Sequence, residues 1–132
     1  MKYRSFEEVP VWRDALELAV LIFELTSQSA FKGYYSVKDQ LERAGVSISN
    51  NIAEGFERGT TQETLTFLYI AKGSSGEVRS LTYLLERLCA FATLRSENLR
   101  SEIPSCKHFP ATSRLVHFIA ERGYQGTTLP DG

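Results

Sequence analysis

A run of small and polar residues at positions 47–55, Ser-Ile-Ser-Asn-Asn-Ile-Ala-Glu-Gly, constrains the fold of this chain more than any other feature. The run lies inside a helical pattern, yet it carries asparagine and glutamate where a simple core helix would carry leucine. A second small-residue helical segment follows at positions 70–77. The two segments together predict two closely packed helices with polar groups at or beside their contact.

Length and composition fit one globular domain. The chain has 132 residues, of which 42% are hydrophobic and 23% are charged, and these values are typical of a single soluble unit. The net charge of −1 argues against a strongly electrostatic nucleic-acid binder, because such proteins gain affinity by neutralising phosphates. A local basic patch formed on assembly stays compatible with this balance.

Nothing in the sequence indicates export or membrane insertion. Cys89 and Cys106 lack metal-ligand spacing, and we expect buried apolar side chains there rather than a disulfide or a catalytic thiol. The first residues form no apolar run like a secretory signal, and no apolar stretch approaches membrane-spanning length. We therefore expect a cytoplasmic protein that does not enter a membrane.

The first predicted helix begins near Pro10, since proline is tolerated in a first turn, and fades after Thr26. Its apolar stripe is unusually wide. The stripe comprises Val11, Ala15, Leu18, Ile22 and Leu25, and is widened by Trp12, Leu16, Ala19 and Phe23.

The second helix is expected to open at Ser36, with Asp39 completing an approximate capping box, and to end near Gly59. Gly45 and Gly55 lower its helix propensity by up to about 1 kcal/mol each relative to alanine. A tertiary reason for these small residues is therefore expected.

The third helix is expected from Thr60, capped with Glu63, to about Phe91. It is apolar on more than one side, which favours an oligomer interface, although a deeply central helix would show the same pattern. The short link makes the second and third helices antiparallel. Folding the chain about residue 60 then places Ala44 and Ser47 opposite Gly76 and Gly73.

The last third is less regular. Pro104 and Pro110 interrupt an apolar helical pattern that starts near Leu94 and resumes from Leu115 to about Arg122. These elements predict an all-α, up-down antiparallel four-helix bundle over residues 1–122, with the fourth helix kinked or split near the two prolines. Residues 123–132 are expected to form a flexible tail.

Enzyme chemistry finds little support. His108 and His117 have no neighbouring nucleophile, and the Glu-x-x-His motif of di-metal bundles is absent from the sequence. Segment 73–76 resembles part of a phosphate loop, but Glu77 stands where a Walker A motif requires lysine. We predict no catalytic, cofactor-binding or metal-binding residue.

One pair of carboxylates is a candidate for general acid–base catalysis. Glu54 and Glu77 could face each other across the second and third helices. A structural role is favoured, in which the carboxylate is satisfied by Arg43, Asn51 or a serine, because buried charges are usually paired.

Nucleic-acid binding is a further candidate function. The basic residues of the two central helices could contact phosphates, while Phe56, Tyr69 and Tyr83 could stack on bases. These side chains alternate with acids, which is more typical of an ordinary solvated surface. The basic residues are Lys38, Arg43, Arg58, Lys72, Arg79 and Arg87.

The sequence resembles the proteins encoded within intervening sequences of bacterial 23S ribosomal RNA genes. The matching stretches are Phe6 with 9–12, then 39–44, 47–48, 51–55 and 67–77, with a weaker match at 113–115. The Asn-Ile-Ala-Glu-Gly element with a downstream Ala-x-Gly-Ser is the most specific part. The polar residues of the matching motifs are Gln40, Arg43, Ser47, Asn51, Glu54, Ser74 and Glu77.

That family is similar in fold to the accessory protein of diversity-generating retroelements, a pentameric bundle that binds reverse transcriptase and nucleic acid. The resemblance implies a homopentameric four-helix bundle without enzyme activity. It leads us to expect a binding or scaffold module that assembles with copies of itself. The alternative is an accessory protein that binds structured RNA or DNA through residues assembled on the oligomer, namely Lys38, Arg58, Lys72, Arg79 and Arg87.

Two features depart from that pattern. The chain lacks the strong basic balance of the retroelement protein, which weakens the nucleic-acid alternative. Its fourth helix is interrupted by proline, so the last element is expected to pack differently from a continuous helix.

Overall fold

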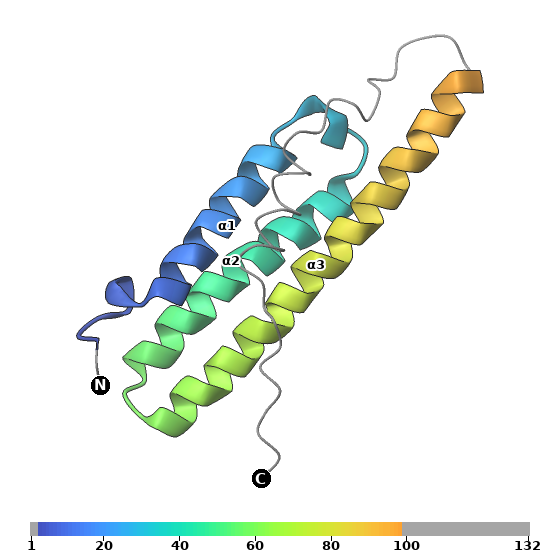
Figure 1. Cartoon of the computed structure of the whole chain (residues 1–132). Helices are drawn as coiled ribbons and strands as arrows, with labels where there is room; N and C mark the ends of the chain where they lie inside the picture. Colours follow the sequence, from blue (N-terminus) through green and yellow to red (C-terminus); the bar gives the residue numbers. More distant parts are fainter. Residues whose placement is uncertain (1–2, 99–132) are drawn as a thin grey trace.

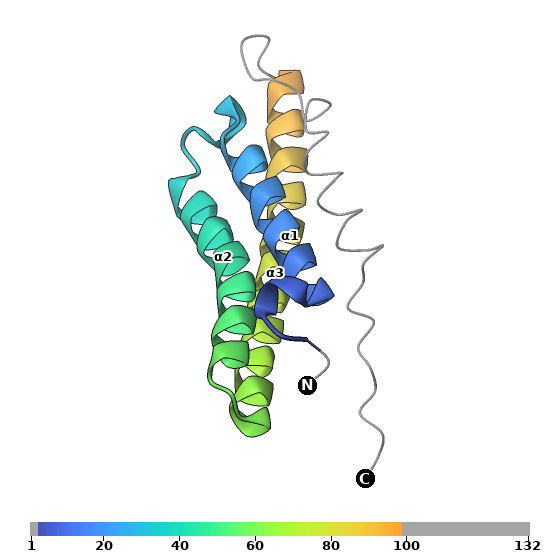
Figure 2. The ribbon, with the colours of Figure 1, turned by 90° about the vertical axis from the view of Figure 1, so that its left-hand side faces the viewer.

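Three long helices run alternately up and down. The computed structural model describes residues 3–98, and no β-strand occurs within this range. Figure 1 shows α2 between α1 and α3, and in the turned view of Figure 2 α2 stands to one side while α1 lies in front of α3. The helices are α1 (Pro10–Thr26), α2 (Tyr35–Glu57) and α3 (Thr61–Asn98), and the 3-10 turns η1 (Phe6–Glu8) and η2 (Ser29–Phe31) precede α1 and α2. The all-α prediction is confirmed.

The region predicted as a fourth helix differs from expectation in its first part. Leu94 belongs to α3, which continues to Asn98 rather than ending near Phe91. No proline or glycine lies between Phe91 and Asn98 to stop the helix. The predicted break at Pro104 and Pro110, the remainder of the fourth helix and the predicted tail lie outside the described residues.

The core is built from the apolar stripes of all three helices. Ile22 and Leu25 of α1, Leu41 of α2 and Val78 of α3 are its largest fully buried side chains. Their recurrence at helical spacing explains why each helix turns one face inward. Phe31 of η2 is also buried and joins this cluster.

The ends of α2 and the start of α3 test the caps predicted from the sequence. The Thr60 hydroxyl accepts the Glu63 amide at 3.3 Å, so the predicted cap at Thr60 is confirmed. The Glu63 carboxylate accepts from the Thr60 hydroxyl at 2.6 Å, and not from the Thr60 amide as in a full capping box. Gly59 ends α2 with a φ of +78°, a left-handed conformation that favours glycine. The predicted cap at Ser36 is wrong, because the helix already includes Tyr35 and has no side-chain cap.

Two glycines of α2 allow neighbouring helices to approach closely. A Cβ at Gly45 would lie 2.6 Å from Cδ1 of Ile22 in α1. One at Gly55 would lie 2.7 Å from Cβ of Phe67 and 3.3 Å from the Thr64 carbonyl oxygen, both in α3. The expectation of a tertiary reason for these glycines is confirmed.

The predicted contact of small residues from α3 with α2 is wrong in detail. A Cβ at Gly73 or Gly76 would have no neighbour within 4 Å among the described residues. Ser74 faces α2 instead, because the helical turn directs Gly73 and Gly76 away from the contact. Gly55 of α2 takes the part that the sequence analysis had assigned to the glycines of α3.

Replacing Gly55 by alanine is expected to lower the free energy of unfolding by about 1–3 kcal/mol, since the added methyl group meets a Cβ and a backbone oxygen that cannot move aside freely. Gly45→Ala is the matched control. Its one close neighbour is the end of the Ile22 side chain, with the Ala19 Cα at an ordinary contact distance of 3.8 Å, and the gain in helix propensity of up to about 1 kcal/mol offsets part of the cost. Chemical denaturation measures both values, and an equal or larger loss for Gly45→Ala would contradict this packing.

Candidate functional site

A small hydrogen-bonded cluster joins α2 to α3. The hydroxyl oxygens of Ser47 and Ser74 lie 2.8 Å apart across the helix contact. The Asn51 amide donates to the Ser47 carbonyl at 2.7 Å and to the Ser47 hydroxyl oxygen at 3.0 Å. The amide nitrogen only donates, which leaves the Ser47 proton available for Ser74. The cluster confirms the antiparallel register and gives three motif residues a structural role.

The other motif residues point to solvent. Gln40 and Glu77 are exposed, and Arg43 is exposed with its Nε 3.3 Å from a carboxylate oxygen of Asp39. Glu54 accepts a hydrogen bond from Arg58 at 2.8 Å. The expectation of a buried Glu54 paired with Arg43, Asn51 or a serine is therefore wrong, because its position on α2 turns the carboxylate outward. The hydrogen bond and charge of Glu54 raise the pKa of Arg58 above its ordinary value.

Glu54 and Glu77 do not form a carboxylate pair. Gly55, next to Glu54, packs on Phe67. Glu77 lies ten residues further along α3, about 15 Å away at 1.5 Å per residue. The register of the two helices thus rules out joint acid–base work by these two side chains within one chain.

The described residues contain neither a metal cluster nor a spanning helix. No group of three or more potential ligand side chains within residues 3–98 is placed to hold a metal ion. No helix in the same range is long and apolar enough to cross a membrane. The two histidines considered above, His108 and His117, lie outside this range.

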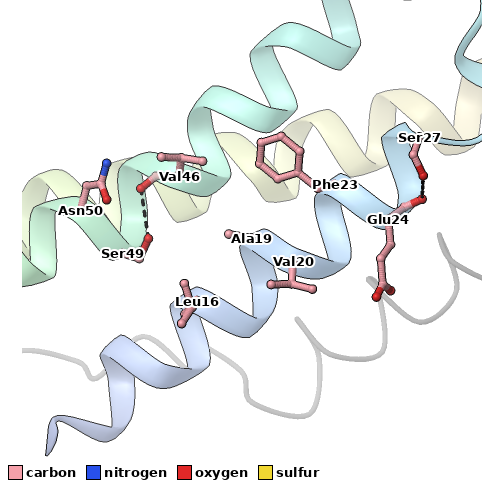
Figure 3. A pocket seen from close by; sticks show the side chains of 9 residues that line it. All are labelled: Leu16, Ala19, Val20, Phe23, Glu24, Ser27, Val46, Ser49 and Asn50. Atoms are coloured by element: carbon pink, nitrogen blue, oxygen red, sulfur yellow. Dashed lines mark hydrogen bonds between the residues drawn. The ribbon is translucent and has the colours of Figure 1, made fainter. Parts of the chain in front are cut away.

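An open groove runs between α1 and α2 (Figure 3). Its volume is about 570 Å³. We define the α1/α2 groove by its lining residues Leu16, Ala19, Val20, Phe23, Glu24, Ser27, Val46, Ser49 and Asn50. Leu16, Val20 and Phe23 are each about half exposed, although they are large and apolar.

This groove is not among the sites predicted from the sequence. Leu16, Ala19 and Phe23 were identified only as members of a widened stripe. The available signal was the width of that stripe, since a helix with one buried face needs a narrower apolar arc. The structure divides the stripe into a buried part at Ala15, Leu18 and Ile22 and an exposed part at the groove.

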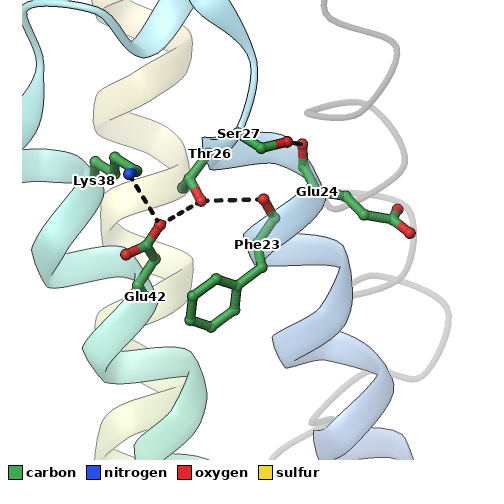
Figure 4. A network of polar contacts seen from close by, with 6 residues as sticks. All are labelled: Phe23, Glu24, Thr26, Ser27, Lys38 and Glu42. Atoms are coloured by element: carbon green, nitrogen blue, oxygen red, sulfur yellow. Dashed lines mark hydrogen bonds and ion pairs between the residues drawn. The ribbon is translucent and has the colours of Figure 1, made fainter.

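A second hollow, of about 400 Å³, adjoins the groove and has a more polar lining. It shares Phe23, Val46 and Asn50 with the groove and adds Asp39, Glu42, Arg43 and Ser47. Figure 4 shows the polar contacts beside it. The Thr26 hydroxyl donates to Glu42 at 2.6 Å, and Lys38 lies 3.6 Å from the same carboxylate oxygen. These contacts tie the end of α1 to the first half of α2.

The α3 outer face carries exposed aromatic and basic side chains, with the exposed acids Glu77 and Glu86 beside them on the same stretch of α3. Tyr69 and Tyr83 are 59% and 63% exposed. Residues at three- and four-residue spacing share a helix face, which here points away from the core. We define the α3 outer face as Tyr69, Lys72, Gly73, Gly76, Arg79, Tyr83 and Arg87, all exposed or half-buried.

The predicted nucleic-acid contacts separate into two groups. Lys72, Arg79 and Arg87 share the α3 outer face, and none of them has an ion pair within residues 3–98. Lys38 is paired with Glu42 beside α1. Arg58 is paired with Glu54 and lies 5.4 Å from the centre of the Phe67 ring. The structure therefore gathers only three of the five predicted residues.

Ser47→Ala is expected to lower the free energy of unfolding by about 1 kcal/mol, because it removes the partner of the half-buried Ser74 hydroxyl across the helix contact. Glu54→Gln is the matched control on the same helix. Exposed ion pairs contribute little to stability, so its denaturation midpoint should stay that of the parent chain. A larger loss for Glu54→Gln than for Ser47→Ala would contradict the assigned roles.

Comparison with known proteins agrees with the motif analysis. A family model described as 23S rRNA-intervening sequence protein matches residues 7–109. The match includes α1, α2 and α3 and ends before the weaker resemblance noted at 113–115. No curated protein matches the chain significantly. Because the family model covers most of the sequence, the chain belongs to the 23S rRNA-intervening sequence protein family.

Proposed function

We propose that this chain is a non-enzymatic, homo-oligomeric helical bundle that acts in the cytoplasm as a binding or scaffold module. One observation carries the proposal: large apolar side chains remain exposed on two helices beyond the needs of the core. They are Leu16, Val20 and Phe23 on α1 and Leu65, Tyr69, Ile70, Tyr83 and Leu84 on α3. Contiguous exposed apolar surface marks interaction sites in proteins.

Assembly of identical copies is the simplest use of these surfaces. Most soluble oligomers are built from identical chains with closed symmetry. The fold-level resemblance to the pentameric accessory protein of diversity-generating retroelements favours five copies. The proposal therefore describes a ring of small bundles whose outer surfaces present binding sites for a further partner.

The oligomeric mass tests this function directly. Light scattering or native mass spectrometry of the full chain is expected to give about 75 kDa, five times the 14.9 kDa of one chain. The mass should persist on dilution, because burial of the exposed apolar side chains stabilises the assembly. A monodisperse species of one chain would contradict the proposed function.

Nucleic-acid binding is the second candidate, favoured by the α3 outer face. Lys72 and Arg79, which have no ion pair within the part of the chain that the structure describes, lie between two exposed tyrosines and provide phosphate contacts and stacking groups on one helix.

This candidate predicts binding to structured RNA that weakens with salt. Each phosphate contact contributes about 0.7–0.9 to the slope of log K against log salt concentration, so Lys72→Gln with Arg79→Gln should flatten that slope. Fluorescence anisotropy with a labelled RNA hairpin provides the measurement. Lys38→Gln, which alters a cation held by Glu42, is the control. Absence of binding at low salt would remove the candidate.

A further inference from the structure

We propose that the α3 outer face of one copy seats in the α1/α2 groove of a second copy. The inference rests on the proposed self-association and specifies which surfaces meet. It is carried by three properties of the two surfaces: their shapes, their charges and the directions in which they face.

The shapes are complementary. The groove is an apolar hollow of about 570 Å³, and its α1 wall from Leu16 to Ser27 extends about 16 Å along the helix. On α3, Tyr69 and Tyr83 stand about 21 Å apart, with Gly73 and Gly76 between them. The two tyrosines can therefore flank the ends of the groove while the glycines lie over its middle.

The glycines need an explanation from outside their own chain. Glycine weakens a helix interior relative to alanine. Gly45 and Gly55 offset that weakness by close contacts inside the protomer, whereas Gly73 and Gly76 have no neighbour within 4 Å among the described residues. If a helix of a second copy packs closely on α3, Gly73 and Gly76 allow that close contact, as Gly45 and Gly55 do inside the protomer.

The charges are also complementary. Glu24 is the charged residue in the lining of the groove, whereas the acids of the adjoining hollow are paired, Asp39 with Arg43 and Glu42 with Lys38. The α3 outer face instead carries the three cations Lys72, Arg79 and Arg87, which outnumber the two exposed acids beside it, Glu77 and Glu86. Within residues 3–98, neither Glu24 nor these three cations have an ion pair. Docking brings acidic and basic groups together, which favours the encounter and fixes its register.

The directions of the two surfaces define the type of contact. In Figure 3, α3 passes behind α1 and α2, so the groove opens away from α3. A contact between two different surfaces is heterologous, and it generates a ring when the rotation between copies closes. Pairing groove with groove would oppose acids, and pairing α3 with α3 would oppose bases. The head-to-tail arrangement avoids both repulsions.

This arrangement also has a consequence for nucleic acid. Lys72 and Arg79 would lie inside the contact between copies and would not be available to phosphates. The α3 outer face cannot serve both partners at once, so the second candidate function and this inference make opposite predictions for the same residues.

The test uses one variant of each surface in the full chain. Val20→Arg places a cation in the groove, where it meets the basic α3 outer face. Gly76→Glu fills the glycine surface with a group that the acidic groove repels. Both positions are solvent-accessible, and Gly76 has no neighbour that a side chain would displace. Each variant alone is expected to run as a single chain of 14.9 kDa in native mass spectrometry.

Mixing the two variants is expected to restore complexes larger than one chain. The intact α3 of Val20→Arg fits the intact groove of Gly76→Glu, and the altered surfaces carry opposite charges. An interface of groove with groove, or of α3 with α3, would respond to only one variant. The control Glu57→Arg introduces the same side chain at an exposed position outside both surfaces and should retain the parental mass.

A charge exchange provides a second pair of variants in case either substitution disturbs folding, which far-UV circular dichroism would detect. Glu24→Lys and Lys72→Glu should each weaken assembly, and the two changes in one chain should restore it. If Val20→Arg or Gly76→Glu alone keeps the oligomeric mass of the parent, the inference is overturned and the proposed function stays intact. A parental chain that is monomeric would overturn both.

The RNA measurement gives a separate outcome. One outcome is that the parental chain binds RNA and the Lys72→Glu variant loses that binding at an unchanged oligomeric mass. In that outcome the α3 outer face serves nucleic acid and the inference is wrong. If Lys72→Glu dissociates the oligomer, the face serves contact between copies.

Discussion

The close antiparallel contact between α2 and α3 is the interaction on which the rest of the structure depends. At one point Gly55 lets the backbones approach until only a glycine fits, and further along Ser47 and Ser74 share a hydrogen bond. The first contact fixes the distance between the helices and the second fixes their register. Since sliding one helix along the other would take these half-buried hydroxyls away from each other, it would lose this hydrogen bond and is disfavoured.

That contact decides which surfaces remain open. Once α2 is held against α3 on one side and against α1 on another, its neighbours are left with apolar side chains that no described element covers. The α1/α2 groove and the α3 outer face both result from this geometry. The surfaces available to partners therefore lie on the outside of the bundle, where exposed apolar side chains coincide with charges that have no ion pair among residues 3–98. They do not lie among the motif residues that hold the helices together.

The polar motif residues divide according to their place on the helix. Ser47, Asn51 and Ser74 lie in the contact and satisfy one another, whereas Glu54 lies one helical turn beyond Asn50 and faces solvent with Arg58. In the sequence these residues appear only as polar members of the family motifs. Burial separates them, because a rotation of a few tens of degrees around a helix moves a side chain from the contact to the surface.

The sequence by itself determined the helical class, the limits of α1, the stop at Gly59, the Thr60 cap and the antiparallel pairing of α2 with α3, because these depend on local periodicity and short-range chemistry. It also determined the family through its motifs. Only the tertiary structure decided that Gly55, rather than Gly73 and Gly76, makes the close contact, and that Phe23 is exposed. The reason is physical: periodicity shows that a helix has an apolar face, but the rotation of each helix about its axis is fixed by the neighbours against which it packs.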